Sequence, residues 1–218
     1  MTVRLAVFDC DGTMIDGQSS ICEAMEAAFS QFALPLPERA AIRRAVGLSL
    51  PQAVRRLVPD ADADLQRRLV DAYKQAFRQA RVDGQLSQPL FAGIAPLLDA
   101  LRADGWALGV ATGMSDRGLA HCLATHGITD RFVTLQTADR HPSKPHPAML
   151  EAALFEAAAD PAHAVMIGDT AFDMAMAADA GVRAIGVDWG YHEPDELRAA
   201  GAEFVAASVA ELQGYLLR

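Results

Sequence analysis

The stretch AVFDCDGTMID, residues 6–16, decides the fold that this sequence predicts. It continues a largely apolar run that begins at residue 3 and indicates a buried strand, and its Asp-Gly pair is typical of the turn that ends one. Asp9 and Asp11 are two residues apart, so we expect both side chains to face the same way, with Cys10 between them as a small buried hydrophobe. Two carboxylates this close are tolerated if a divalent cation neutralises them or if one holds a proton.

Three further apolar runs precede polar turns, and helical patterns separate them. The strand candidates are residues 106–112, 163–169 and 183–188, and the helix candidates are residues 94–104, 116–127, 146–159 and 171–181. Strands that alternate with helices predict an α/β fold, here a doubly wound parallel sheet in a three-layer α/β/α arrangement. Ligands bind at the carboxyl ends of the strands in such sheets. The two aspartates of the first stretch therefore lie where a binding site is expected.

Residues 17–88 interrupt this alternation with helical patterns alone. The patterns cover residues 19–33, 38–46, 51–58 and 62–82, so we expect a helical insert between a first strand (residues 1–16) and the rest of the core (residues 89–218). The insert holds ten basic and eight acidic residues, a net charge of +2, whereas the whole chain carries −9. The insert is therefore either a set of solvated helix faces or a cationic lid over an anionic substrate.

The bulk composition narrows the class of protein. A chain of 218 residues, 51% hydrophobic and 22% charged, is typical of a globular protein with one sizeable core and a small subdomain. We expect no membrane segment and no secretory signal, because no apolar run has the required length, and no nucleic-acid partner, because the net charge is acidic. Three cysteines without metal-like spacing favour a reducing, cytoplasmic location. No glycine-rich nucleotide-binding fingerprint is present in the sequence.

A second acidic motif, GDTAFDM, occupies residues 168–174. Asp169 and Asp173 are four residues apart at a helix start and can lie on one face. Acidic residues are common at helix N-termini for electrostatic reasons alone. Combined with Asp9 and Asp11, however, they make a set of hard oxygen ligands suited to Mg²⁺, which takes one or two carboxylates together with substrate phosphate.

Two further motifs are suited to binding phosphate. Lys144 is one of only two lysines, against seventeen arginines, which suggests that this position requires a compact ammonium group. Thr112 and Gly113 follow a strand and precede a helix, so the hydroxyl and the neighbouring backbone N–H groups can donate to phosphoryl oxygens. Thr-Gly is also an ordinary turn, so this second motif is supportive only.

In order, FDCDGT, ATG, SKP and GDTAFD resemble the four motifs of the haloacid dehalogenase-like hydrolases. The helical insert resembles the small cap of that family, and the motifs are most similar to those of its phosphoglycolate phosphatase-like branch. The resemblance implies that Asp9 attacks phosphorus and becomes an aspartyl-phosphate, and that Asp11 protonates the leaving alcohol and later takes a proton from water. It also implies Mg²⁺ as cofactor and assigns residues to the metal and phosphate sites. The metal site comprises Asp9, the carbonyl of Asp11, Asp169 and, in support, Asp173; the phosphoryl site comprises Thr112, Gly113 and Lys144.

Asp11 directs the expectation toward phosphate esters, because the dehalogenases of the family generally lack a second aspartate. We therefore expect a phosphatase of a small phosphorylated metabolite, either phosphoglycolate-like or a sugar phosphate. Residues 43–52 are the expected substrate-facing part of the insert, with Arg44 and Ser49 as candidates.

Several alternatives stay open. A sugar phosphomutase uses the same core residues, and a non-catalytic phosphate or metal sensor could share the scaffold. A phosphonate hydrolase is disfavoured, because its cap lysine could only be Lys74, whose surroundings read as a polar helix face. The oligomeric state, monomer or homodimer, is not indicated by the sequence.

Overall fold

The computed structural model describes residues 2–218 and contains one six-stranded parallel sheet. Its strands lie in the order β3-β2-β1-β4-β5-β6, and every neighbouring pair is parallel. The strands are β1 (Arg4–Phe8), β2 (Trp106–Thr112), β3 (Thr134–Thr137), β4 (Ala164–Gly168), β5 (Arg183–Val187) and β6 (Phe204–Ala206).

Helices cover both faces of the sheet. Alternate residues of each strand point to opposite sides, and the apolar side chains on each side pack against helices. Ala6 and Phe8 of β1 pack with α5 (Ile94–Ala103), α6 (Asp116–Thr125) and α10 (Val209–Leu216). Leu5 and Val7 pack with α7 (Ala148–Ala157), α8 (Ala171–Asp179) and α9 (Pro194–Ala199) on the other face. Short 3-10 turns occupy Thr129–Arg131 and Pro161–His163. The predicted doubly wound α/β fold is therefore confirmed.

Two strands of the sheet, β3 and β6, have no counterpart among the strands expected from the sequence. Both lie at the edges of the sheet. The β3 sequence, TLQT, is largely polar, and β6 has only three residues. A short or polar edge strand lacks the apolar run by which the central strands are recognised. Helices α9 and α10 were likewise not expected, although α10 supplies buried Leu212 and Leu216 to the core.

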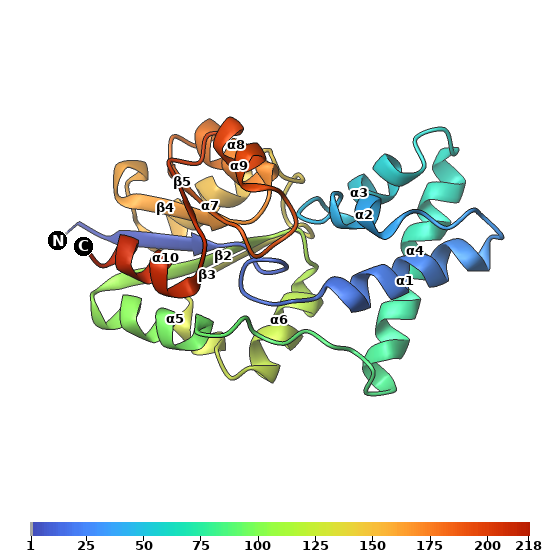
Figure 1. Cartoon of the computed structure of the whole chain (residues 1–218), viewed down its shortest axis with the longest axis horizontal. Helices are drawn as coiled ribbons and strands as arrows, with labels where there is room; N and C mark the ends of the chain where they lie inside the picture. Colours follow the sequence, from blue (N-terminus) through green and yellow to red (C-terminus); the bar gives the residue numbers. More distant parts are fainter. Residues whose placement is uncertain (1) are drawn as a thin grey trace.

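Four helices between β1 and α5 lie apart from the sheet. They are α1 (Gln18–Gln31), α2 (Arg39–Arg43), α3 (Leu50–Leu57) and α4 (Ala63–Val82). They enclose a hydrophobic cluster of their own, which includes Met25, Phe29, Val54 and Leu69. Figure 1 shows them beyond one end of the strands, while the C-terminus lies at the opposite end. The division into a core and an insert bounded at residues 17 and 88 stays a prediction. In residues 2–218, no helix has both the length and the apolar character needed to cross a membrane.

The strand order also places the candidate site. From β1 the sheet extends through β2 in one direction and through β4 in the other. In doubly wound sheets the crevice at such a reversal, outside the carboxyl ends of the strands, is where ligands bind. Asp9 follows β1 and Asp169 follows β4, so the two aspartates come together at this crevice.

Candidate active site

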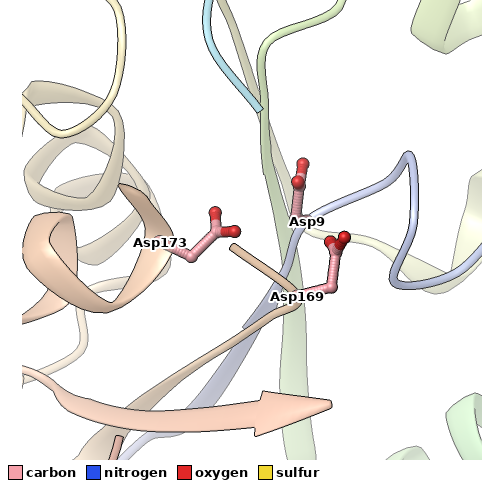
Figure 2. A group of neighbouring side chains, drawn as sticks. All are labelled: Asp9, Asp169 and Asp173. Carbon is pink, nitrogen blue, oxygen red and sulfur yellow. The ribbon is translucent and has the colours of Figure 1, made fainter. Parts of the chain in front are cut away.

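Three buried carboxylates meet at the carboxyl edge of the sheet. Asp9 follows β1, Asp169 follows β4 and Asp173 lies in the first turn of α8, and each offers an oxygen within 4.8 Å of the others. Figure 2 shows them arranged around a common space, with Asp173 reaching toward it from the helix. Three carboxylates at this separation repel one another strongly, so the arrangement is stabilised by cations or by bound protons.

Lys144 supplies one such cation from the loop before α7. Its ammonium nitrogen lies 2.9 Å from Oδ1 of Asp9 and 2.6 Å from Oδ1 of Asp173. The residue is 1% exposed. Burial alone would lower the pKa of Lys144, but the two carboxylates raise it above its usual value. Lys144 is therefore a permanent cation that joins Asp9 to Asp173.

Asp9 keeps one carboxylate oxygen without a partner. Its Oδ1 accepts a hydrogen bond from the backbone N–H of Cys10 at 2.7 Å and forms the ion pair with Lys144. Its Oδ2 is buried and accepts no hydrogen bond from residues 2–218. Burial, and to a lesser extent the charge of Asp173, raises the pKa of Asp9 to about 6 against the opposing effect of Lys144. A buried, unpaired carboxylate oxygen is costly, and it is the kind of ligand that a bound cation would satisfy.

Asp169 is fixed by the turns around it. Oδ1 accepts a hydrogen bond from the Thr13 hydroxyl at 2.8 Å, and Oδ2 accepts one from the backbone N–H of Tyr191 at 2.9 Å. A Cβ at Gly12 would lie 2.2 Å from Oδ2 of Asp169, and a Cβ at Gly190 would lie 2.2 Å from the Cβ of Asp169. The two turns can therefore close around this carboxylate only with glycine at both positions. Burial and the nearby carboxylates raise the pKa of Asp169.

Asp173 has protein partners on both oxygens. Oδ1 accepts from Lys144, and Oδ2 accepts from the backbone N–H and the hydroxyl of Thr170. This is a capping box, in which Thr170 is the N-cap residue of α8 and the Asp173 side chain accepts from the Thr170 backbone N–H. Asp173 is therefore less available to a metal than Asp9, and it orients both Lys144 and the helix.

Asp11 lies outside the group of three carboxylates. β1 ends at Phe8, so the two-residue alternation used to place Asp9 and Asp11 on one face does not extend to residue 11. A Cβ at Gly17 would lie 2.5 Å from Oδ1 of Asp11, so the glycine that begins α1 leaves room for this carboxylate. Burial and the charge of Asp9 raise the pKa of Asp11 to about 7. Cys10, between the two aspartates, is buried in the core as expected.

A cavity of about 700 Å³ opens beside Asp9 and Asp11, between the core and the four inserted helices. Thr112 and Gly113 line it from the core, together with these two aspartates. Lys144, Asp169 and Asp173 are buried and are not among its lining residues. A small molecule in this cavity would meet Asp9 and Asp11 first, with the other charged groups behind them.

Thr112 and Gly113 line the cavity where the core contacts a loop of the insert. The buried Thr112 hydroxyl accepts a hydrogen bond from the backbone N–H of Met114 at 3.2 Å. A Cβ at Gly113 would lie 2.5 Å from the carbonyl oxygen of Leu48, so the loop before α3 rests directly on this glycine. The insert and the core are thus in close contact beside Asp9.

Of the two candidates in the insert, only Ser49 reaches the cavity. Ser49 is among its lining residues, and its backbone N–H donates to the Ser143 hydroxyl at 2.8 Å. Arg44 instead forms an ion pair with Glu196 of α9 and is not a lining residue. Arg44 therefore links the insert to the core at a position away from the cavity.

Sequence reasoning missed the residues that hold Asp169. Thr13 was part of the first motif but had no assigned role, and Tyr191 belongs to a loop with no recognisable spacing. The Trp189 indole donates to the carbonyl of Thr13 at 3.1 Å, so this loop after β5 packs on the first motif. A contact between residues 176 positions apart leaves no local signal.

Comparison with known proteins gives a consistent result. Residues 6–187 match the family model described as haloacid dehalogenase-like hydrolase. A Dickeya dadantii (strain 3937) protein named "Probable phosphatase IndB" is 34% identical over 213 residues, 96% of this chain and 92% of the relative. A phosphoglycolate phosphatase of Vibrio vulnificus (strain YJ016) is 26% identical over 99% and 96% of the two chains. The structure of a "predicted phosphatase" from Clostridium acetobutylicum has a TM-score of 0.89 at 23% identity, covers 100% and 99% of the chains, and shares the fold.

Proposed function

We propose that this chain, which belongs to the haloacid dehalogenase-like hydrolase family, is a Mg²⁺-dependent phosphatase of small phosphate monoesters that acts through an aspartyl-phosphate. The observation that carries the proposal is the position of Asp9. Its carboxylate lines the cavity, keeps one buried oxygen unpaired and lies against the Lys144 ammonium. That combination suits a nucleophile whose charge is balanced by a neighbouring cation and whose second oxygen has no partner within the protein.

The donor set fits a hard divalent cation. Asp9 and Asp169, together with the carbonyl of Asp11, would hold Mg²⁺, and Asp173 would support it through Lys144 and α8. When bound, the cation supplies positive charge that screens the approach of an anionic phosphate to a carboxylate and stabilises the transition state. The unpaired Oδ2 of Asp9 supports this assignment, because a cation would satisfy it.

The reaction has two steps at these residues. A carboxylate oxygen of Asp9 attacks phosphorus, the bond between phosphorus and the alcohol oxygen breaks, and Asp11 donates a proton to the departing alkoxide. Water then attacks the aspartyl-phosphate while Asp11 takes a proton from it, which releases phosphate and restores the Asp9 carboxylate. General acid–base assistance of this kind typically contributes about 10²- to 10⁴-fold.

The remaining core residues bind the phosphoryl group. The Thr112 hydroxyl and the backbone at Gly113 line the cavity and would donate to phosphoryl oxygens. The Lys144 ammonium would balance the negative charge of Asp9. It contacts both Asp9 and Asp173 in this structure, so it would reach a phosphoryl oxygen only after moving away from one of these two carboxylates. We keep Ser49 as a substrate-binding candidate, and we assign Arg44 to the contact between insert and core.

Residues 17–88 act in this proposal as a cap that closes over the reacting atoms. The contacts that join it to the core in this structure include the hydrogen bond from the Ser49 N–H to the Ser143 hydroxyl and the ion pair of Arg44 with Glu196. Closure would exclude bulk water from the first step and strengthen the electrostatic interactions there. Small phosphorylated metabolites are the substrates that such an enclosed cavity would admit.

Phosphate release across a panel of esters tests the proposal. The panel contains phosphoglycolate, sugar phosphates, nucleoside monophosphates, pyrophosphate and a phosphonate, each assayed with Mg²⁺ and with EDTA. We expect Mg²⁺-dependent release of phosphate from at least one monoester. Conversion of a sugar phosphate to an isomer without release would indicate a phosphomutase instead, and no reaction with any ester would favour a sensor.

A further inference from the structure

A group of cations lines the cavity at a position that the proposed chemistry does not use. Lys74, Arg78 and Arg81 come from α4 of the insert, and Arg117 comes from α6 of the core. Within residues 2–218, none of the four forms an ion pair. Apart from Asp9 and Asp11, Asp139 is the one acidic residue in the lining as described, and its carboxylate accepts from the backbone N–H of Asp116. This part of the cavity therefore carries an excess of positive charge.

Arg81 and Arg117 line the same cavity, Arg81 from α4 of the insert and Arg117 from α6 of the core. Burial lowers the pKa of Arg81, and the charge of Arg117 lowers it further. The Nε atom of Arg81 is buried and has no hydrogen-bond partner among the described residues. A guanidinium with a buried, unsatisfied donor, in a cavity lining that holds a second arginine, makes an environment that an anion would stabilise.

These arginines are separate from the reacting carboxylates. Among the described residues, Asp9 pairs with Lys144 and the Cys10 N–H, and no arginine forms a hydrogen bond or ion pair with Asp9 or Asp11. Much of the remaining lining is apolar and includes Ile21, Met25, Val46 and Phe77. Tyr73 and Phe77, one turn apart on α4, stack with ring centroids 5.7 Å apart. A molecule that spanned the cavity would therefore be anionic at both ends and apolar between them.

We propose that Arg78, Arg81 and Arg117 form a second anion-binding site, which holds an anionic group carried by the alcohol part of the phosphate ester. The inference rests on the proposed phosphatase function and narrows its substrate class to monoesters with an apolar linker and a distal carboxylate or similar anion. A polyhydroxylated alcohol fits less well, because buried hydroxyl groups that face an apolar wall lack hydrogen-bond partners. Arg81 and Arg117 come from different parts of the chain, so an anion between them also holds the insert against the core.

Binding to a protein that cannot turn over tests this site directly. The Asp9→Asn variant with Mg²⁺ is titrated by calorimetry with a series of ω-carboxyalkyl phosphates and with alkyl phosphates of matched length. A charge-assisted contact predicts that, at one or more lengths, the carboxylate ester binds about 10-fold or more tightly than its partner. The same titrations are repeated in Asp9→Asn with Arg81→Gln and Arg117→Gln added. A matched control adds Arg55→Gln, which removes an exposed charge of the insert outside the cavity lining.

The preference for the carboxylate ester should vanish with Arg81→Gln and Arg117→Gln and persist with Arg55→Gln. Equal affinity of the paired esters at every length would overturn the second site, and so would a preference that survives the loss of both arginines. Mg²⁺-dependent phosphate release from the same esters by the wild-type protein tests the proposed function separately. Release without any carboxylate preference contradicts the second site alone, and preferential binding without release contradicts the phosphatase alone.

Discussion

The Nζ atom of Lys144 lies 2.9 Å from Oδ1 of Asp9, and both side chains are almost completely buried. The same ammonium contacts Asp173 at 2.6 Å. A buried cation that bridges two carboxylates ties the loop before α7 to β1 and α8. Its removal leaves two buried negative charges facing each other, which is strongly unfavourable.

Lys144→Met is therefore expected to lower the free energy of unfolding by about 3–5 kcal/mol at pH 8, measured by urea denaturation. The loss should be smaller at pH 5, where the carboxylates can take up protons. Adding Asp173→Asn should recover part of the stability without restoring phosphate release. A loss well under about 1 kcal/mol at pH 8 would contradict the buried bridge.

Gly12 offers a test of the tight turn around Asp169. Its φ is +86°, and a Cβ there would lie 2.2 Å from Oδ2 of Asp169. Gly12→Ala should reduce phosphate release by about 10²-fold or more, because displacement of a site group by about 1 Å has effects of that size. Gly84→Ala is the matched control: φ is +68° with nothing within 4 Å, so only the backbone strain is added. Comparable losses of activity in the two variants would show that the contact with Asp169 is unimportant.

The stability of the metal-free protein should fall as the pH rises. The pKa of Asp9 is raised to about 6 and that of Asp11 to about 7, from 3.8 in each case. Between the ordinary pKa of 3.8 and these raised values, the folded protein binds more protons than the unfolded chain. The stability is therefore greatest at acidic pH and falls as the pH rises through the pKa values of the folded protein. Chemical denaturation in EDTA should show a decrease on the order of 3 kcal/mol from pH 5 to pH 8. Saturating Mg²⁺ should reduce the decrease, and a metal-free stability that rises with pH would contradict the account.

The central part of the fold could be predicted because its signals are local. Each of β1, β2, β4 and β5 is an apolar run that ends in a polar turn, and each intervening helix has its own periodicity. Edge strands β3 and β6 carry no such signal, because one is polar and the other very short.

The acidic residues of the site could be identified from two motifs, but their arrangement could not. Asp9 and Asp11 line the same cavity, but the sequence did not show that the Asp9 carboxylate groups with Asp169 and Asp173 while the Asp11 carboxylate lies outside that group. That grouping depends on where β1 ends and on the pairing of β1 with β4, which are properties of the sheet as a whole.

The cavity lining was the least predictable part. Arg44 appeared suited to substrate binding by its charge, but it pairs with Glu196, a residue 152 positions away. Arg81 lies on a helix whose polar residues read as a solvated face, and its place in the cavity lining and its unpaired Nε atom distinguish it. Which face of an inserted helix points toward a site depends on how the insert docks, and this is not encoded in local periodicity.

The central claim is that Asp9 forms a covalent phosphoryl intermediate, and trapping that intermediate tests it most directly. In the Asp11→Asn variant, 4-nitrophenyl phosphate can still phosphorylate Asp9, because its leaving group needs no proton, whereas hydrolysis lacks the group that takes a proton from water. Acid quenching and peptide mass spectrometry should then find the mass of one phosphoryl group on the peptide that contains Asp9, dependent on Mg²⁺ and absent when Asp9→Asn is added. Mg²⁺-dependent phosphate release by the wild-type protein, with no adduct at Asp9 in the variant and near-normal activity of Asp9→Asn, would contradict the account.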